Sequence, residues 1–296
     1  MMNFDYIIAG LRLRADRDLV EAGIRGFKPF AVDVEGEADC TITCVDSIDV
    51  DELCVRRELS TSYVAEADAD SSFARTKTGY LYSIQRKRTG SQMVHFHIDK
   101  ESGRVITDIK AIDQIDVSIM RFGIWVMFGV VLAAHGAIAI HSSTIVSKGR
   151  GVLFLGESGT GKSTHTRLWR ENIEGARLLN DDSPIIRVTE DGLRVYGSPW
   201  SGKTPCYKNE SYPVAALCRL AQAPENKIQR LNTIFAIGAL LPSCPPIFAH
   251  DEYLQDNICK TLDKVIAGTP VFRLECLPNA DAAQMSYLTT IVLTER

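Results

Sequence analysis

The sequence predicts a mixed α/β fold, with a smaller β-rich N-terminal domain over residues 1–112 and an α/β domain over residues 113–296. Two patterns support this division. Runs of aromatic and β-branched residues alternate with turn-forming residues in the first part, which is typical of strands and hairpins. In the second part, short apolar runs alternate with helical patterns, which is typical of an α/β core.

The composition is that of a soluble globular protein. The 296 residues are 45% apolar and 24% charged, and the net charge is −4, so neither a nucleic-acid partner nor an anionic membrane is favoured. The first five residues lack the basic region of a secretory signal, and eight irregularly spaced cysteines fit reduced, mostly buried thiols. We therefore expect a cytoplasmic protein.

The N-terminal part carries no recognisable catalytic pattern. Residues 80–84 and 93–98 are rich in aromatic and β-branched side chains, and a turn at residues 88–91 separates them. A second turn precedes residues 104–109, so we expect a hairpin or a meander. The role of residues 1–112 is left open.

A long apolar stretch follows. Residues 115–134 predict a helix, and residues 122–134 form an unbroken run of thirteen apolar residues that ends before His135 and Gly136. Thirteen residues are short for a membrane span but ordinary for a helix in a protein core. The sequence therefore predicts a buried helix and no membrane association, with a membrane helix as the alternative.

The second part reads as alternating strands and helices. We expect strands over residues 137–146, 152–155, 185–188 and 271–277, and a helix over residues 162–172. Asp251 is placed to cap a helix that ends near Gly268, and Asp281 is placed to cap a last helix.

A glycine-rich loop carries the strongest functional signal. The pattern Gly-x-x-x-x-Gly-Lys-Ser lies between an apolar strand and a helix, as in the phosphate loops of nucleoside triphosphate-binding proteins. Backbone N–H groups and the helix N-terminus bind the phosphates, Lys162 reaches the β- and γ-phosphates, and the Ser163 hydroxyl ligates Mg²⁺. The sequence predicts ATP and Mg²⁺ as cofactors, with these nucleotide-binding residues: Gly156, Glu157, Ser158, Gly159, Thr160, Gly161, Lys162, Ser163 and Thr164.

An acidic pair provides the second element that such a site needs. Asp181 and Asp182 follow a short apolar stretch, nineteen residues beyond Lys162. Adjacent carboxylates can divide the work, because one can hold the metal while the other takes a proton from a hydroxyl. The alternative is a solvated acidic turn before Pro184.

These motifs resemble a known family. The glycine-rich loop followed by Leu-Leu-Asn-Asp-Asp resembles the catalytic domain of HPr kinase/phosphorylase, and ATP-dependent phosphoenolpyruvate carboxykinase has similar elements. The chain most resembles a group of bacterial HPr-kinase-like proteins, in which a His-Ser segment precedes the loop and a Gly-x-Pro-Trp-x-Gly-Lys segment follows the acidic pair. The resemblance covers about residues 116–290, and residues 194–200 lack the glutamate of the HPr kinase signature.

The resemblance implies roles for three residues. Asp181 would be the general base on a substrate hydroxyl, Asp182 would be a Mg²⁺ ligand, and His141 would lie near the site. A histidine at the end of a strand is as often a hydrogen-bonded structural residue, so both interpretations of His141 stay open.

The segment 197–203 is the candidate for the acceptor side. Its glycines and proline predict a defined loop, Trp200 offers a flat apolar face, and Lys203 offers a cation for a phosphate. We expect substrate contacts from Gly197, Trp200, Gly202 and Lys203, with Lys203 also stabilising the transferred group. The alternative is an ordinary surface turn with a packed tryptophan.

The sequence thus favours a kinase that transfers the γ-phosphoryl group of ATP to a hydroxyl of a protein, peptide or small metabolite. A non-transferring ATP-dependent switch or scaffold is the alternative, because a phosphate loop indicates binding and not transfer. The acceptor is unidentified, and an oligomer is compatible with the sequence.

Overall fold

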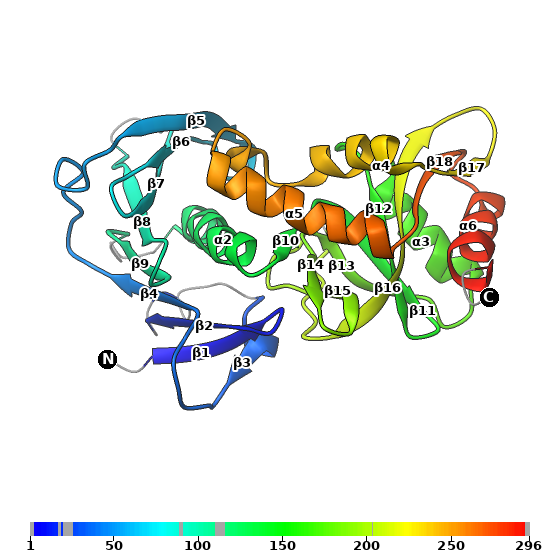
Figure 1. The fold of residues 1–296 in the computed structure, drawn as a ribbon, viewed down its shortest axis with the longest axis horizontal. Coiled ribbons are helices and arrows are strands. Elements are labelled where there is room, and N and C mark those ends of the chain that lie inside the picture. Colours follow the sequence, from blue (N-terminus) through cyan, green and yellow to red (C-terminus); the bar gives the residue numbers. More distant parts are fainter. Residues whose placement is uncertain are drawn as a thin grey trace. The chain divides into compact units, whose positions relative to one another are not determined.

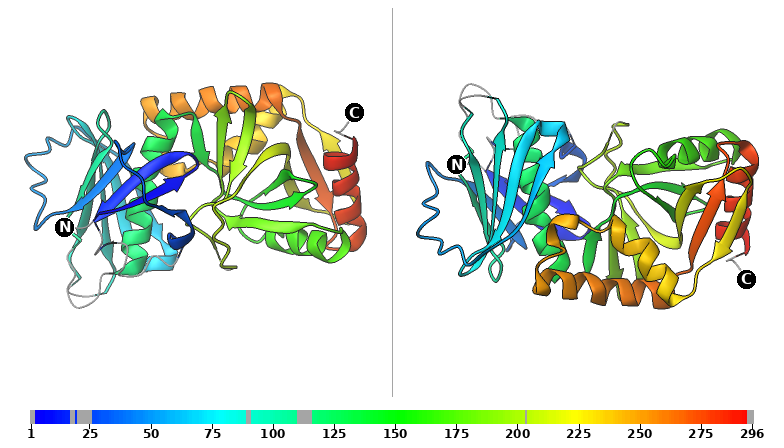
Figure 2. Two further views of the ribbon diagram at one scale, coloured as in Figure 1. Left: turned by 90° about the horizontal axis from the view of Figure 1, so that it is seen from below. Right: turned by 90° about the horizontal axis from the view of Figure 1, so that it is seen from above.

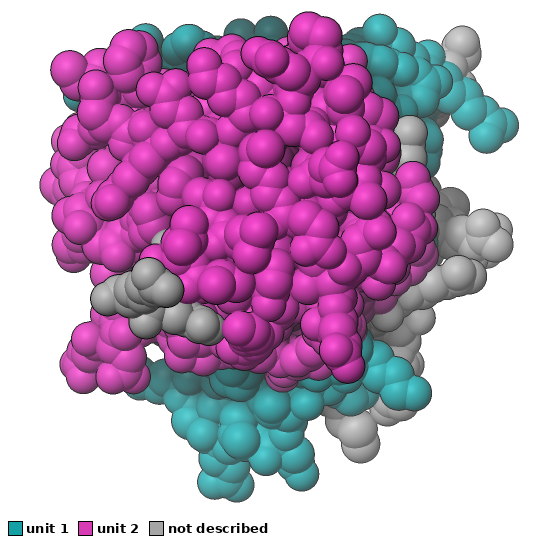
Figure 3. Space-filling view, turned by 90° about the vertical axis from the view of Figure 1, so that its right-hand side faces the viewer, with its two compact units in different colours: residues 1–135, 247–255 teal, residues 136–246, 256–296 magenta. Residues whose placement is uncertain are grey.

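The computed structural model describes residues 3–16, 19, 26–88, 91–109, 116–202 and 204–293 (Figure 1). The chain divides into two compact units, coloured separately in Figure 3. Unit 1 comprises Met1–His135 and Ile247–Gln255, and unit 2 comprises Gly136–Pro246 and Asp256–Arg296. The division therefore lies after residue 135 and not at the expected residue 112.

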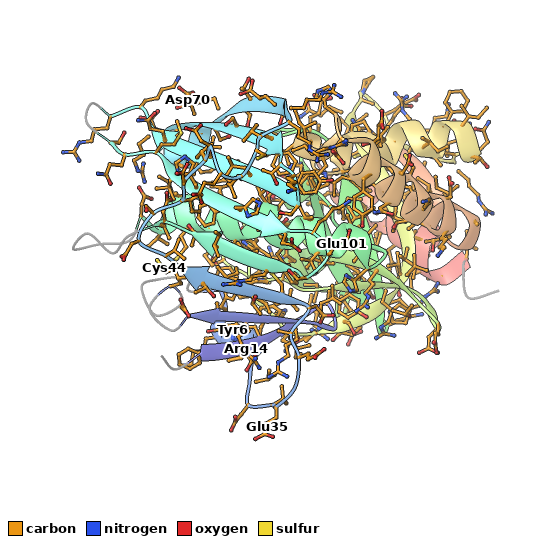
Figure 4. The ribbon with its side chains drawn as sticks, turned by 60° about the vertical axis from the view of Figure 1, so that its left-hand side comes forward. Tyr6, Arg14, Glu35, Cys44, Asp70 and Glu101 are labelled. Atoms are coloured by element: carbon orange, nitrogen blue, oxygen red, sulfur yellow. The ribbon has the colours of Figure 1, made fainter. Side chains whose placement is uncertain are left out.

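Unit 1 is built on a sheet. Within the described residues, nine strands form it in the order β3-β1-β2-β4-β9-β8-β7-β6-β5. Neighbouring strands are antiparallel except that β4 runs parallel to β2 and to β9. Figure 4 labels Tyr6 on β1, Arg14 on β2, Cys44 on β4 and Asp70 on β6. The strands are β1 Asn3–Ile8, β2 Leu11–Asp16, β3 Ala31–Val32, β4 Cys40–Cys44, β5 Arg57–Val64, β6 Ala69–Arg75, β7 Gly79–Arg86, β8 Val94–Asp99 and β9 Arg104–Thr107.

The apolar helix α2, Val117–Ala134, packs against β7 and β8 of this sheet. Gly123 permits the close approach, because a Cβ atom there would collide with the Phe96 ring on β8. In the described part of the chain, α2 alone has the length and composition of a membrane-crossing helix, and 67% of it is buried. This packing explains why α2 belongs to unit 1.

A buried carboxylate fixes the segment Ile247–Gln255 to unit 1. Asp251 accepts hydrogen bonds from Nε of Arg75, at 2.8 Å, and from the Tyr80 hydroxyl, at 2.8 Å. It also accepts the backbone N–H of Leu254, at 3.0 Å, and so caps the helix α5, Glu252–Gly268. The predicted N-cap is confirmed, and the same residue attaches the return segment to the sheet.

The described part of unit 2 holds a second nine-stranded sheet. Its order is β10-β14-β15-β16-β12-β11-β13, and β18 continues it by pairing with β16 and β17. β16 runs parallel to β12 and to β18. The strands are β10 Ala137–Ala139, β11 Ser142–Ser147, β12 Arg150–Leu155, β13 Arg177–Asp182, β14 Ile185–Thr189, β15 Gly192–Tyr196, β16 Ser211–Gln222, β17 Lys227–Arg230 and β18 Val271–Cys276.

Helices cover both faces of this second sheet (Figure 2). The helices α3, Lys162–Asn172, and α6, Ala280–Tyr287, pack together over one face. The helix α4, Thr233–Leu240, and the later part of α5 lie on the other. A mixed α/β fold with two multistranded sheets therefore agrees with the predicted fold class.

Two details differ from the prediction. The expected strand 137–146 is two strands, because the chain leaves β14 after Ala139 and joins β12 and β13 from Ser142. The last helix is capped by Asn279, whose side chain accepts the N–H of Ala282 at 3.0 Å, and Asp281 lies in its first turn.

Candidate functional site

The glycine-rich loop joins β12 to α3, and its glycines are required by the backbone. Gly156, Gly159 and Gly161 have φ values of 150°, 83° and 98°, which disfavour residues with a Cβ atom. At Gly156 a Cβ atom would also lie 2.5 Å from the Thr160 hydroxyl. The loop therefore depends on glycine at these positions. It places the N-terminus of α3 next to the end of β12.

Lys162 is buried and bonds to its own loop. Its Nζ donates to the carbonyl oxygens of Gly156, at 2.7 Å, and Glu157, at 3.0 Å. Burial lowers the pKa of Lys162, and the charges of Asp182 and Asp181 oppose that shift. The ammonium is thus a poorly hydrated cation whose present partners are neutral, so an anion in the loop would be a stronger partner.

Ser163 links the loop to the acidic pair. Its hydroxyl donates to Oδ1 of Asp181 at 3.0 Å. The Asp181 residue is only 6% exposed, whereas Ser163 is exposed. A hydroxyl and a carboxylate in contact beside a cationic loop form an oxygen-rich corner suited to a hard divalent cation. Among the described residues, no group of three or more His, Cys, Asp or Glu side chains forms a metal cage.

Asp182 has a different partner and an unusual backbone. Its Oδ1 lies 3.2 Å from Nδ1 of His141, and both side chains are nearly half-exposed. Its φ of 141° is rare for a residue with a side chain, and strain of this kind is often found at functional sites. The acidic pair therefore presents one carboxylate to Ser163 and the other to His141 and solvent.

A buried asparagine holds the acidic pair against the segment 197–202. Asn180 donates to the Trp200 carbonyl at 2.9 Å and accepts the Ser183 N–H at 3.0 Å. The Gly202 N–H donates to the Asp181 carbonyl at 2.7 Å. The sequence pattern did not identify Asn180 as important, although a polar residue between an apolar strand and an acidic pair is a usable signal.

The structure brings the expected acceptor segment next to the acidic pair. Asp182 and Ser201 form an isolated β-bridge, and at Gly202 a Cβ atom would lie 3.1 Å from the Asp182 Cβ. Trp200, however, is only 3% exposed, so its indole is packed and does not offer the free face that we expected. Lys203 lies outside the described residues, and its role stays a prediction.

The other flank of the loop is open. A cavity of about 530 Å³ within unit 2 is lined by Glu157 and Thr160 of the loop, by Arg219 of β16 and by α4. Sequence reasoning missed Arg219. The usable signal was a charged residue within an otherwise apolar stretch of strand.

The sheet order explains why these groups meet at one edge. β16 pairs with β12 in parallel. β13 also runs parallel to β12, because both strands are antiparallel to β11, which lies between them. The ends of β13, β12, β16 and β18 therefore lie at the same edge as the start of β11. Such an edge is the usual ligand site of α/β sheets. Across it, the acidic pair and His141 lie on one side of the loop, and Arg219 lies on the other.

The fold and this edge define a mixed α/β protein with a glycine-rich loop at the end of a strand. The family model of the SynChlorMet cassette protein ScmC matches residues 105–265. This match covers more than half of the chain, and the protein belongs to the ScmC family.

A solved structure shows distant similarity to the chain. The structure of the HPr(Ser) kinase/phosphatase from Coxiella burnetii is similar with a TM-score of 0.31 and 13% identity, over 53% of this chain and 88% of that one. This is a distant structural relation to the group that the motifs resemble. No curated protein sequence matches the chain.

Proposed function

We propose that the protein binds Mg·ATP at the glycine-rich loop and transfers the γ-phosphoryl group to a hydroxyl of a protein, peptide or small molecule. The observation that carries the proposal is the 3.0 Å contact between the Ser163 hydroxyl and Asp181. Phosphoryl transfer depends mainly on positioning and charge stabilisation. A phosphate-binding loop joined directly to a buried carboxylate supplies both.

Each loop residue has a defined task in this proposal. Lys162 exchanges its two carbonyl partners for phosphate oxygens, because an ionic hydrogen bond is stronger than one to a neutral acceptor. Ser163 and Asp181 would hold Mg²⁺, which neutralises charge on the phosphates. The remaining ligands of this ion would be phosphate oxygens and water, as is common for Mg²⁺.

The contacts favour a division of labour in the acidic pair opposite to the one that the family resemblance implies. Asp181 contacts the hydroxyl of Ser163 and is buried, so it is placed to help hold the metal. Asp182 is accessible, lies beside the segment 197–202 and contacts His141. Asp182 is therefore placed to accept the proton of the acceptor hydroxyl, with His141 orienting it.

The test is transfer of labelled phosphate from ATP to a panel of serine peptides and small hydroxyl compounds in the presence of Mg²⁺. Lys162→Ala should abolish ATP binding and transfer. Lys264→Ala, on the exposed side of α5, is the matched control and should change neither.

The outcomes separate the alternatives. Acceptor-dependent transfer by the wild type supports the kinase. ATP binding that changes the conformation of the protein without transfer to any acceptor supports the switch. Failure of the wild-type chain to bind ATP with Mg²⁺ contradicts the proposal as a whole.

A further inference from the structure

The cavity on the open flank of the loop has no role in the transfer chemistry described above. We propose that it binds the nucleoside of the nucleotide, with the base against the apolar surface of α4. This inference rests on the proposed function, and it assigns a position to the half of the ligand that the glycine-rich loop does not hold. The volume of about 530 Å³ lies within the range typical of small-molecule sites.

The cavity is continuous with the loop. Glu157 and Thr160 belong to the loop and line the cavity. Gln222, at the end of β16, donates to the Gly159 carbonyl at 3.2 Å and ties the strand to the loop. A ligand whose phosphates occupy the loop can therefore extend directly into the cavity.

The cavity wall has the chemistry that a nucleoside needs. Ile234 and Phe235 on α4 line it and are 79% and 66% exposed. An exposed apolar patch made by two large adjacent residues is typical of a surface that binds a ligand. The flat, apolar face of a base covers such a surface, and base–aromatic stacking is favourable for every base.

Two arginines complete the wall. Arg219 and Arg273 are register partners on the parallel strands β16 and β18, so their side chains start from the same face of the sheet. The Arg219 guanidinium donates to the Ala239 carbonyl of α4 at 3.1 Å and lies 3.8 Å from the Glu157 carboxylate. A guanidinium can stack on a base or bind a phosphate oxygen near the ribose.

The direction of the nucleotide follows from the order of the strands. The γ-phosphate must point towards the metal-binding corner and Asp182, which lie on the β13 side of the loop. The base must therefore extend to another side, and the β16 side provides the cavity. This leaves the segment 197–202 for the acceptor.

Calorimetric titration of the full chain with Mg·ATP and with inorganic tripolyphosphate tests the assignment. Phe235→Ala should weaken ATP binding about ten-fold and leave tripolyphosphate binding unchanged. Gly238→Leu should fill the cavity and have the same selective effect, and a Cβ atom at Gly238 meets nothing within 4 Å. Ile237→Ala alters the same helix outside the cavity lining and is the matched control.

Each outcome decides between defined possibilities. Selective loss of ATP affinity in both cavity variants, with no change in Ile237→Ala, supports the nucleoside site. Unchanged ATP affinity in both cavity variants overturns the inference. Failure of the wild-type protein to bind either ligand contradicts the proposed function itself. That result differs from the one that contradicts only the nucleoside site.

Discussion

The two flanks of the glycine-rich loop differ in how completely the protein itself determines their geometry. On the acidic flank, Asn180 is fully buried and Asp181 nearly so, and hydrogen bonds fix both to the segment 197–202. On the α4 flank, Ile234 and Phe235 are mostly exposed. Groups that take part in the reaction must be preorganised in the free protein, whereas groups that only cover the ligand can become ordered when it binds. The comparison predicts that substitutions on the acidic flank mainly reduce the transfer rate, and that substitutions on the α4 flank mainly reduce the affinity for the nucleotide.

The largest expected effect distinguishes the two carboxylates. Asp182→Asn should keep Mg·ATP binding and reduce transfer by about 10²- to 10⁴-fold, the range for loss of a general base. Asp181→Asn should instead weaken the dependence of nucleotide binding on Mg²⁺. Steady-state transfer rates and Mg²⁺ titrations measure the two effects. The reverse pattern would restore the roles implied by the family resemblance, and equal mild effects would show that neither carboxylate takes part in transfer.

The buried face of α3 offers a second comparison. It is as buried as the acidic flank, but most of the side chains around it are apolar. His165 accepts or donates one hydrogen bond with Ser286, and burial lowers its pKa to about 4. The unfolded state therefore takes up a proton first as the pH falls below about 6.5. Stability should be fully present above that pH and decrease towards pH 4, by at most about 3 kcal/mol at about 1.4 kcal/mol per pKa unit.

Chemical denaturation between pH 4 and pH 7 measures this decrease. His165→Gln cannot titrate in this range, so the difference between the two curves isolates His165 from the other groups. A constant difference across the range would show that the histidine does not cause the loss.

A third prediction concerns the hydrogen bonds that make the acidic flank rigid. Asn180→Ala removes the side-chain acceptor of the Ser183 N–H and one donor to the Trp200 carbonyl, which also accepts from the Ser198 hydroxyl at 2.9 Å. It should lower the free energy of unfolding by about 1–3 kcal/mol, the range for removing one partner of a buried hydrogen bond. Asn172→Ala, at the exposed end of α3, is the control and should change stability by less than about 0.5 kcal/mol. Similar effects of both changes would contradict the comparison.

The smallest effect isolates the backbone of Asp182. Glycine tolerates a φ of 141° and alanine does not, so Asp182→Gly should be more stable than Asp182→Ala by about 1 kcal/mol. Neither variant has a carboxylate, and both should therefore lack transfer. Equal stability of the two variants, measured by thermal unfolding, would show that the backbone stores no strain there.

Local patterns predicted the local structure around the glycine-rich loop. The apolar strand, the loop and the helix after Lys162 follow from spacing alone, and the Ser163 hydroxyl contacts Asp181 of the acidic pair, while the binding roles of these residues stay predictions. The cap at Asp251 was also predicted correctly. These features depend on residues that are close in sequence or on one dominant motif.

Features that depend on distant partners were not predicted. The helical pattern of α2 does not reveal that Gly123 packs closely against the Phe96 ring of the unit 1 sheet. The predicted boundary therefore assigned α2 to the wrong unit. The strand-like pattern of residues 137–146 does not show where the chain changes neighbours at His141. The cavity beside the loop combines Arg219 and α4, which meet only through the pairing of β16 with β12 and β18.

The hairpin of β11 and β12 sets the alignment of the whole edge. Lys148 and Gly149 have φ values of 48° and 69° and connect Ser147 to Arg150 by a two-residue turn, a geometry typical of type I′ hairpins. The turn pairs Ser142 with Leu155, which places His141 next to the start of the glycine-rich loop. One inserted residue in this turn would slip the pairing and reverse the faces of β11. The alignment of His141 with the loop is thus encoded about seven residues away, in a two-residue turn.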